Sequence, residues 1–178
     1  MIHPTADVSA QAQIGVNTSI WHQAQVREGA RVGNNCIIGK NVYVDKNVII
    51  GNYCKLQNNA LLYHGVTLED GVCVGPQCIL TNDKIPRALN SDGVLKGDAD
   101  WVEGKITVKI GASLGAGSCI LPGVTIGKYA LIGAGSIVTK DVPDYGLVFG
   151  SPAVLRGYVC KCGGTVNKPG EFCSKCTL

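Results

Sequence analysis

One short period constrains the fold of this chain more than any other feature. Every sixth residue over the first 80 positions is Ile, Leu or Val. The series is Ile2, Val8, Ile14, Ile20, Val26, Val32, Ile38, Val44, Ile50, Leu56, Leu62, Leu68, Val74 and Leu80. A fixed period of six is typical of a parallel β-helix, in which each hexad forms one short strand and a corner. Three hexads close a triangular turn of about 18 residues, and successive turns stack at about 4.8 Å.

The period breaks once, over residues 81–101. This stretch has no repeat and contains several turn formers, and a long irregular loop in a compact domain is commonly functional. The repeat resumes in a second block with Val102, Val108, Leu114, Ile120, Ile126, Ile132 and Val138. We therefore expect an all-β fold, a parallel β-helix of about seven turns with one excursion loop.

The segment after the second block loses the period. Pro143 and Pro152 oppose strand pairing, because proline has no backbone N–H to donate. The helix is therefore expected to span residues 2–143. Residues 144–159 are expected to form an extended tail that leaves the helix and packs on a neighbour.

Residues 160–178 form a third segment with two closely spaced cysteine pairs and a glycine after the first pair. Four thiolates suit a closed, tetrahedral structural zinc site. Two reduced pairs without metal are the alternative. The predicted ligands of this small knuckle are Cys160, Cys162, Cys173 and Cys176.

Composition narrows the class of protein. The net charge of +3 argues against a dedicated nucleic-acid binder. The sequence shows no signal peptide and no long apolar run, so we expect no membrane insertion and a cytoplasmic location. In that compartment the nine cysteines indicate buried thiols and a metal site rather than a disulfide framework.

Four stretches of the chain resemble one enzyme family over about residues 2–158. The most specific is QNNALLYHGVTLEDGVCVGPQCILTN with IPR following. The others are IWHQAQVREGARVGNNCIIGKNV, IGASLGAGSCILPGVTIGKYALIGAGSIVTKDVP and FGSPAVLRG. They are similar to the hexapeptide-repeat N-acetyltransferases that acylate 3-amino groups of nucleotide-linked sugars. The resemblance implies a left-handed β-helix and a homotrimer. It also implies that acetyl-CoA lies along the helix in the groove between subunits.

The leading hypothesis is transfer of acetyl from acetyl-CoA to the 3-amino group of a UDP- or dTDP-linked sugar, for lipopolysaccharide or O-antigen synthesis. The alternative is an O-acetyltransferase acting on a sugar or a small hydroxyl acceptor. A zinc lyase on the same fold would need three converging histidines. The chain has only three in total, with no closely spaced pair, which disfavours it. A non-catalytic scaffold is disfavoured by the polar loop.

The period itself brings two polar residues together. His64 lies two residues after Leu62 and Asn82 two after Leu80, so both belong to one outward column, one turn apart. His64 is the candidate general base, since its ordinary pKa lies near neutral pH, and Asn82 is expected to orient the amine. The alternatives are a sugar contact or a surface histidine for His64, and a corner hydrogen bond for Asn82.

Five further residues are candidates for substrate binding. His22 and Asn58 share a different face, so they would meet the active site only from a neighbouring subunit. Tyr63 offers a ring for a base or sugar, and Arg87 carries the planar fork suited to a diphosphate or an acidic sugar. Glu69 lies at a corner, where a simple hydrogen bond is the alternative to a substrate role.

The candidates for binding coenzyme A come from the glycine-rich second block. Small residues there would let the pantetheine arm lie against the backbone and pair with it. They are Ser113, Gly115, Ala116, Gly117, Ala134 and Gly135. Lys140 and Arg156 are the expected phosphate partners, with simple solvent exposure as the alternative.

Overall fold

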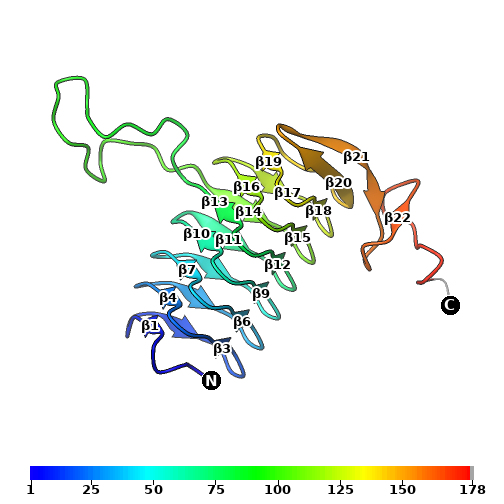
Figure 1. Ribbon diagram of the computed structural model, residues 1–178, viewed down its shortest axis with the longest axis horizontal. Helices are drawn as coiled ribbons and strands as arrows, with labels where there is room; N and C mark the ends of the chain where they lie inside the picture. Colours follow the sequence, from blue (N-terminus) through cyan, green and yellow to red (C-terminus); the bar gives the residue numbers. More distant parts are fainter. Residues whose placement is uncertain (177–178) are drawn as a thin grey trace.

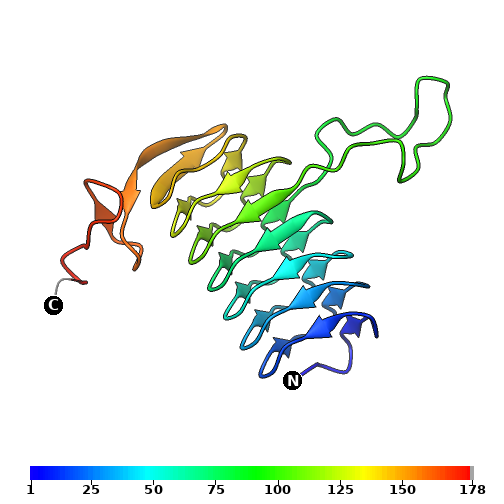
Figure 2. The ribbon, with the colours of Figure 1, turned by 180° about the vertical axis from the view of Figure 1, so that it is seen from behind.

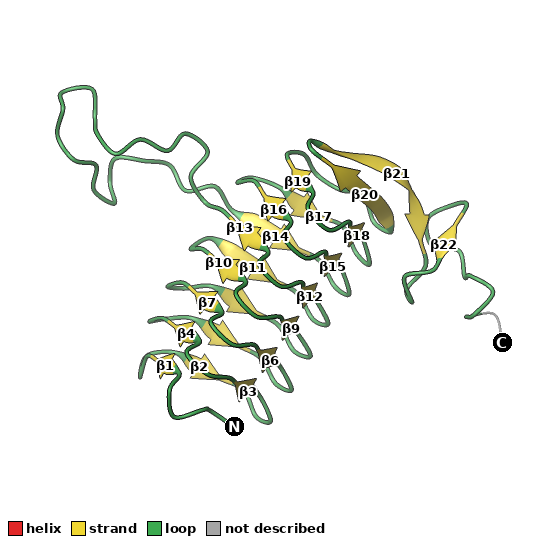
Figure 3. Ribbon diagram, in the orientation of Figure 1, coloured by secondary structure: helices red, strands yellow, loops and turns green. Residues whose placement is uncertain are grey.

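The computed structural model describes residues 1–176 and forms a triangular β-helix with no helical segment in that range (Figures 1 and 3). None of the described residues therefore belongs to a helix that could cross a membrane. The predicted all-β class and parallel stacking are confirmed. Short strands from successive turns pair in parallel, so that Leu62, for example, lies beside Val44 and Leu80.

Three sheets form the sides of the prism. The first sheet contains β1 (Asp7–Val8), β4 (Gln25–Val26), β7 (Tyr43–Val44), β10 (Leu61–Leu62), β13 (Ile79–Leu80), β16 (Cys119–Ile120) and β19 (Ile137–Val138). The second contains β2 (Gln13–Ile14), β5 (Arg31–Val32), β8 (Ile49–Ile50), β11 (Val66–Leu68), β14 (Ile106–Val108) and β17 (Thr125–Ile126). The third contains β3 (Ser19–Ile20), β6 (Ile37–Ile38), β9 (Lys55–Leu56), β12 (Cys73–Val74), β15 (Ser113–Leu114), β18 (Leu131–Ile132), β20 (Gly146–Gly150), β21 (Ala153–Val159) and β22 (Thr165–Val166).

The large aliphatic residues of the repeat fill the interior. From Ile20 to Val138 every repeat position that lies in a strand is buried, and the smaller inward position holds residues such as Ala24, Cys36 and Val48. Each sharp corner requires a residue in the left-handed backbone region, which Asn and Gly adopt at low cost. Asn41 and Asn47 occupy such positions with φ of 55° and 57°. The hexad thus encodes both the core and the corner.

The excursion is longer than the repeat suggested. The helix resumes at Ile106, which pairs with Val66, and the amide of Gly104 donates to the carbonyl of Asn82 across the base of the loop (2.8 Å). Val102, expected as the first core residue of the second block, is 88% exposed. Its agreement with the six-residue phase is a coincidence, because no strand of the helix contains it. Figures 1 and 2 show the loop projecting far from the stack.

Residues 144–159, expected to leave the helix as an extended tail and pack on a neighbour, first return to the helix of their own chain. Val142 bridges to Ile126 and Val148 pairs with Ile132, so two further sides are added after Val138. β21 then runs back antiparallel to β20, and β22 pairs with β21. The two prolines do not prevent this, because Pro143 follows the bridge and Pro152 occupies the turn between β20 and β21.

Candidate functional site

The corner between the first and second sheets, here called the histidine corner, holds Asp45, His64 and Asn82. Nδ1 of His64 lies 2.6 Å from Oε1 of Glu103, and both side chains are about one quarter exposed (28% and 26%). That oxygen is buried and has no other hydrogen-bond partner among the described residues. A carboxylate on Nδ1 fixes the imidazole tautomer and leaves Nε2 as the proton acceptor. This arrangement would suit a histidine that accepts a proton.

A buried carboxylate lies beneath this pair. Oδ2 of Asp45 accepts the backbone amide of His64 (3.1 Å), while Oδ1 accepts the Lys46 amide (2.7 Å) and the Tyr43 hydroxyl (2.9 Å). Arg27 adds an ion pair at 3.0 Å. Burial alone would raise the pKa of Asp45, but these hydrogen bonds and Arg27 outweigh it and hold that pKa below its ordinary value. Asp45 thus fixes the backbone from which the imidazole projects.

The remaining residues of this corner also lie beside the loop. Asn82 is half-buried at the point where the chain leaves the helix, on the turn next to His64. The ring of Tyr63 packs against that of Tyr43 at a centroid distance of 5.7 Å. Residues that the period placed together are therefore neighbours in the structure.

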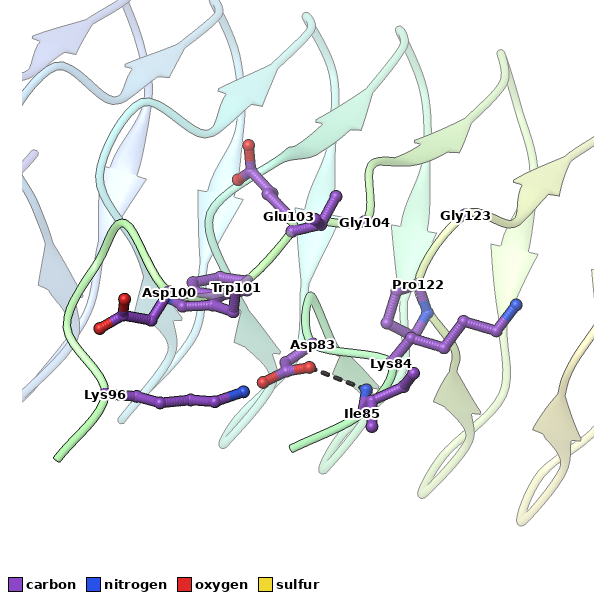
Figure 4. A pocket seen from close by; sticks show the side chains of 11 residues that line it. Asp83, Lys84, Ile85, Lys96, Asp100, Trp101, Glu103, Gly104, Pro122 and Gly123 are labelled. Atoms are coloured by element: carbon purple, nitrogen blue, oxygen red, sulfur yellow. Dashed lines mark hydrogen bonds between the residues drawn. The ribbon is translucent and has the colours of Figure 1, made fainter. Parts of the chain in front are cut away.

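A cavity of about 520 Å³ opens beside this corner, between the two arms of the loop and the helix (Figure 4). Its apolar lining comes from Ile85, Trp101, Val102 and Pro122, and Glu103 is also part of its wall. Ligand sites are typically concave and mostly apolar with a few placed polar groups. The cavity meets that description and reaches the carboxylate that holds His64.

Arg87 and Glu69 lie elsewhere. Arg87 is exposed, and its guanidinium bonds the carbonyl of Pro86 (2.9 Å). Glu69 accepts the backbone amide of Ile110 through Oε2 (2.8 Å), which is the corner hydrogen bond considered as its alternative.

His22 and Asn58 share the predicted separate face. They line one shallow groove with Trp21, and the ring of His22 stacks on His3 at 3.5 Å. Asn58 accepts the amide of Lys40 (2.9 Å). Within one chain this face is a different corner from that of His64.

The corner between the second and third sheets, here called the ladder corner, is closed by side chains. Each Asn or Asp there accepts the backbone amide of the residue one turn below. Asn34 takes the amide of Val16 (2.8 Å), Asn52 that of Asn34 (2.9 Å) and Asp70 that of Asn52 (2.7 Å). No open backbone donor is left at these three described positions.

The corner between the third and first sheets differs in its upper turns. Ala116 and Ala134 stand where Asn or Asp would provide the ladder, and both are exposed. No hydrogen bond to the amide of either alanine comes from the residues that the structure describes. We call this pair the alanine corner. Two exposed donors in line, one turn apart, suit the carbonyl groups of an extended ligand.

The glycines beside the alanine corner have two different roles. Gly117 and Gly135 have positive φ, and a Cβ built on either would contact nothing within 4 Å. Their surface is open to a ligand. A Cβ on Gly115 would lie 2.5 Å from the amide nitrogen of Ala134, so Gly115 is required by the close stacking of turns. Ser113 lies in β15 and is half-buried.

The two predicted phosphate partners are both exposed. Lys140 lines a groove together with Leu155 in the last turn. The guanidinium of Arg156 lies over the ring of Phe149, 5.3 Å from its centroid. Neither is held in an ion pair within the described chain, so both positive charges are available to an anion.

The four cysteines of the C-terminal segment converge. Their sulfur atoms lie within 4.8 Å of one another, with neighbouring pairs at 3.0, 3.3 and 3.9 Å. A Cβ on Gly164 would lie 2.8 Å from the sulfur of Cys173, so only glycine allows the chain to pass so near the cluster. The set fits a closed tetrahedral zinc site with four thiolate ligands. Residues 177–178 of the predicted segment lie outside the described part.

Comparison with known proteins agrees with this geometry. The fold defines a hexapeptide-repeat protein. Residues 108–140 match a model described as the hexapeptide repeat of succinyl-transferase, and residues 1–94 match a model described as the GMPPB C-terminal domain. The second match covers more than half of the 178 residues, and the chain belongs to that family.

Curated relatives include sugar acetyltransferases. The chain is 58% identical over 59 residues to dTDP-3-amino-3,6-dideoxy-alpha-D-galactopyranose 3-N-acetyltransferase of Aneurinibacillus thermoaerophilus, covering 33% of this chain and 31% of that protein. It is 50% identical over 52 residues to galactoside O-acetyltransferase of Lactococcus lactis, covering 29% and 25%. The chain thus matches about a third or less of the length of each.

The fold is shared with a solved structure, the acetyltransferase domain of PglB from Neisseria gonorrhoeae. The TM-score is 0.56 at 22% identity, over 88% of this chain and 57% of that one. At this level of identity the likeness concerns the fold alone.

Three residues near the site were not found from the sequence. Glu103 and Trp101 belong to the loop, where no period predicts a position. Asp45 had a visible signal, because it directly follows a core aliphatic at a position that is often glycine elsewhere in the repeat.

Proposed function

We propose that this chain is an acetyltransferase that transfers the acetyl group of acetyl-CoA to the 3-amino group of a nucleotide-linked amino sugar. The observation that carries the proposal is the His64–Glu103 pair, an oriented base beside a ligand-sized cavity. The N-acetyltransferase from Aneurinibacillus thermoaerophilus, named for a dTDP-linked 3-amino sugar, supports this acceptor class. UDP or dTDP as the nucleotide, a cytoplasmic location and a role in cell-surface polysaccharide synthesis belong to the same proposal.

The chemistry requires one base and one anion-stabilising donor. The neutral amine attacks the thioester carbonyl, and Nε2 of His64 accepts the proton that the nitrogen loses. Glu103 stabilises the imidazolium through Nδ1. The carbon–sulfur bond then breaks, and the departing thiolate takes the proton from His64, which restores the base. A backbone amide in the glycine-rich turns is suited to hold the oxyanion.

We propose that acetyl-CoA binds between two copies of the chain. His64 and the alanine corner lie on different edges of one prism, so a single copy does not bring them together. In the cyclic trimer that we propose, the histidine corner of one copy would face the alanine corner of the next. Asn82, Tyr63 and Arg87 would serve the acceptor, while His22 and Asn58 would approach from the neighbour. Lys140 and Arg156 would bind the phosphates.

Transfer to a hydroxyl is the second candidate, supported by the match to the Lactococcus galactoside O-acetyltransferase. A hydroxyl is far less acidic than an ammonium, so this reaction depends more strongly on an oriented base. The experiment is release of free thiol from acetyl-CoA, with UDP- and dTDP-linked 3-amino sugars beside their 3-hydroxy counterparts. Turnover with the amino sugars alone is expected.

Replacement of the base separates the roles of the residues. His64→Ala is expected to lower kcat by about 10²- to 10⁴-fold, the range typical of a lost general base. Gln11→Ala, in an exposed turn at the N-terminal end of the helix and several turns below His64, is the control and should retain activity. Full activity of His64→Ala would remove the base from the mechanism. Transfer to hydroxyl acceptors would favour the second candidate, and no thiol release with any acceptor would overturn both.

We also propose that the four terminal cysteines hold one structural zinc ion. Four thiolates leave no open coordination position, which suits a structural role rather than a catalytic one. Elemental analysis should give one zinc per chain in the purified protein. Cys173→Ser is expected to lose the metal, while Cys119→Ser should keep it. Absence of zinc from the native protein after purification without chelators would contradict the site.

A further inference from the structure

We propose that the cavity beneath the excursion loop is the binding site for the nucleobase of the acceptor, which stacks on the indole of Trp101. This inference rests on the proposed function, because it assigns one end of the nucleotide-linked substrate. The apolar lining includes Ile85 and Val102, which are 70% and 88% exposed. Exposed aliphatic side chains around an indole leave apolar surface for a flat ring to cover.

The charged residues of the cavity are not equivalent. Asp83 and Asp100 hold the loop in shape, since their carboxylates accept the amides of Ile85 and Gly97 (both 2.8 Å). Lys96 has no hydrogen bond or ion pair from the described residues that would occupy its ammonium group. The hydrogen bond from Gly97 and, more weakly, the charge of Lys96 hold the pKa of Asp100 below its ordinary value. Lys96 makes no ion pair with Asp100, so its ammonium can still bind the diphosphate next to the base.

Lys84 is free in the same sense, since nothing in the described chain bonds its ammonium. Figure 4 shows Lys84 and Lys96 on different arms of the loop, with Trp101 above Lys96. Both lysines line the cavity and come from different arms of the loop, so their positive charges suit the diphosphate that joins base and sugar.

The position of the cavity connects it to the reacting end. Glu103 lines the cavity and contacts Nδ1 of His64 (2.6 Å). A ligand whose base lies on Trp101 can therefore extend its sugar toward His64. The loop is fixed at both ends of this path. Gly104 bonds Asn82 at its base, and Lys46 pairs with Asp98 (3.2 Å).

The chain offers a direct probe, because it has only two tryptophans. Trp21→Phe leaves Trp101 as the sole indole and does not touch the cavity. Titration of this variant with UDP or dTDP is expected to quench its fluorescence in a saturable manner. Uridine diphosphate glucose, which lacks the amine, should quench the fluorescence as well, because its uracil ring is the part that stacks on Trp101.

Kinetics give the second readout. Trp101→Ala should raise the KM for the nucleotide-linked amino sugar by about 10-fold, in keeping with the loss of one stacked base, and leave the KM for acetyl-CoA unchanged. Trp101→Phe keeps an aromatic face and should restore most of the affinity. Lys84→Ala with Lys96→Ala should also raise the acceptor KM, whereas Lys128→Ala, on another corner, should not.

The outcomes separate this inference from the proposed function. Acetyl transfer with an unchanged acceptor KM in Trp101→Ala would overturn the nucleobase site and leave the reaction standing. Saturable quenching by UDP without any acetyl transfer would support the site and remove the reaction. If Trp101 fluorescence changes with protein concentration and not with nucleotide, a second copy covers the cavity and the inference is wrong.

Discussion

Two corners of the same prism show how one repeat is used for opposite purposes. At the ladder corner, the side-chain oxygens of Asn34 and Asn52 accept hydrogen bonds from backbone amides of the turn below, at 2.8 and 2.9 Å. At the alanine corner, Ala116 and Ala134 occupy the corresponding positions, and the amide N–H groups receive no partner from the described chain. The strands and the core are the same on both sides. A single side-chain position per turn decides whether a corner is sealed or available to a ligand.

The difference between the two corners affects both stability and ligand binding. A sealed corner gains a hydrogen bond per turn, worth about 0.5–1.5 kcal/mol. An open corner gives up that bond, which an extended ligand with its own carbonyl groups is suited to replace. We therefore expect the upper turns to give up some stability for the surface that we propose binds acetyl-CoA, as is common where function competes with packing.

The largest expected effect comes from mixing two inactive variants. Ala134→Trp fills the alanine corner and His64→Ala removes the base, so each alone should show almost no turnover. When the two are refolded together in equal amounts, about one quarter of the sites of a cyclic assembly pair an intact His64 with an intact Ala134. Thiol release should then recover to about that fraction of the native rate. No recovery would place both corners of a working site in one copy.

A milder change turns the alanine corner into a copy of the ladder corner. Ala134→Asn would supply a side-chain oxygen to the amide of Ala116, as Asn58 does for Lys40. We expect the KM for acetyl-CoA to rise about 10-fold, the equivalent of one hydrogen bond of about 1.4 kcal/mol, while the melting temperature stays level or rises. Ala24→Gly, a core change in another turn, controls for stability. A lower melting temperature with unchanged KM would contradict the open-corner interpretation.

The histidine corner predicts a pH effect. The pKa of Asp45 is held below its ordinary value in the folded protein, so its carboxylate adds stability at neutral pH that is lost as the pH falls through that lowered pKa. Asp45→Asn should lower the unfolding free energy by about 2 kcal/mol at neutral pH. The gap between variant and native protein should narrow toward acid. Thermal melts across that range test this, and a constant gap would contradict it.

The smallest effect is expected at the ladder corner. Asn52→Ala removes the acceptor for the amide of Asn34 and should destabilise the protein by about 1 kcal/mol, a shift of about 2–4 °C in melting temperature for a chain of this size. The kcat and both KM values should stay unchanged. Calorimetry together with the thiol assay checks both parts. A fall in activity without a fall in stability would show that this corner also binds a ligand.

The repeat was predictable because its contacts are fixed by spacing. Residues six apart occupy equivalent sides and residues 18 apart stack, so the core, the column of His64 and Asn82, and the separate face of His22 could be placed without coordinates. The four cysteines were also recognisable, since their pairs are close in sequence.

The end of the helix shows where local rules mislead. Proline weakens a strand only where its missing N–H is needed. Pro152 occupies a turn between two strands, so β20 and β21 form in spite of it. Val102 lies six residues before Val108 and so matches the phase of the second block, but it is exposed in the loop, because a match in spacing does not require a residue to enter the helix. In both cases the prediction used only neighbouring residues in the sequence. Whether a residue joins a strand depends instead on the distant residues with which it pairs.

The sequence alone determined the prism, its core and the residues along each edge, since a strict period converts position along the chain into position in space. Only the tertiary structure decided which residues of the excursion loop contact the helix. Glu103 reaches His64 and Trp101 lines the cavity only because the loop closes at Asn82 and Gly104. An aperiodic segment has no register of its own, so its place is set by the contacts made after it folds against the stack.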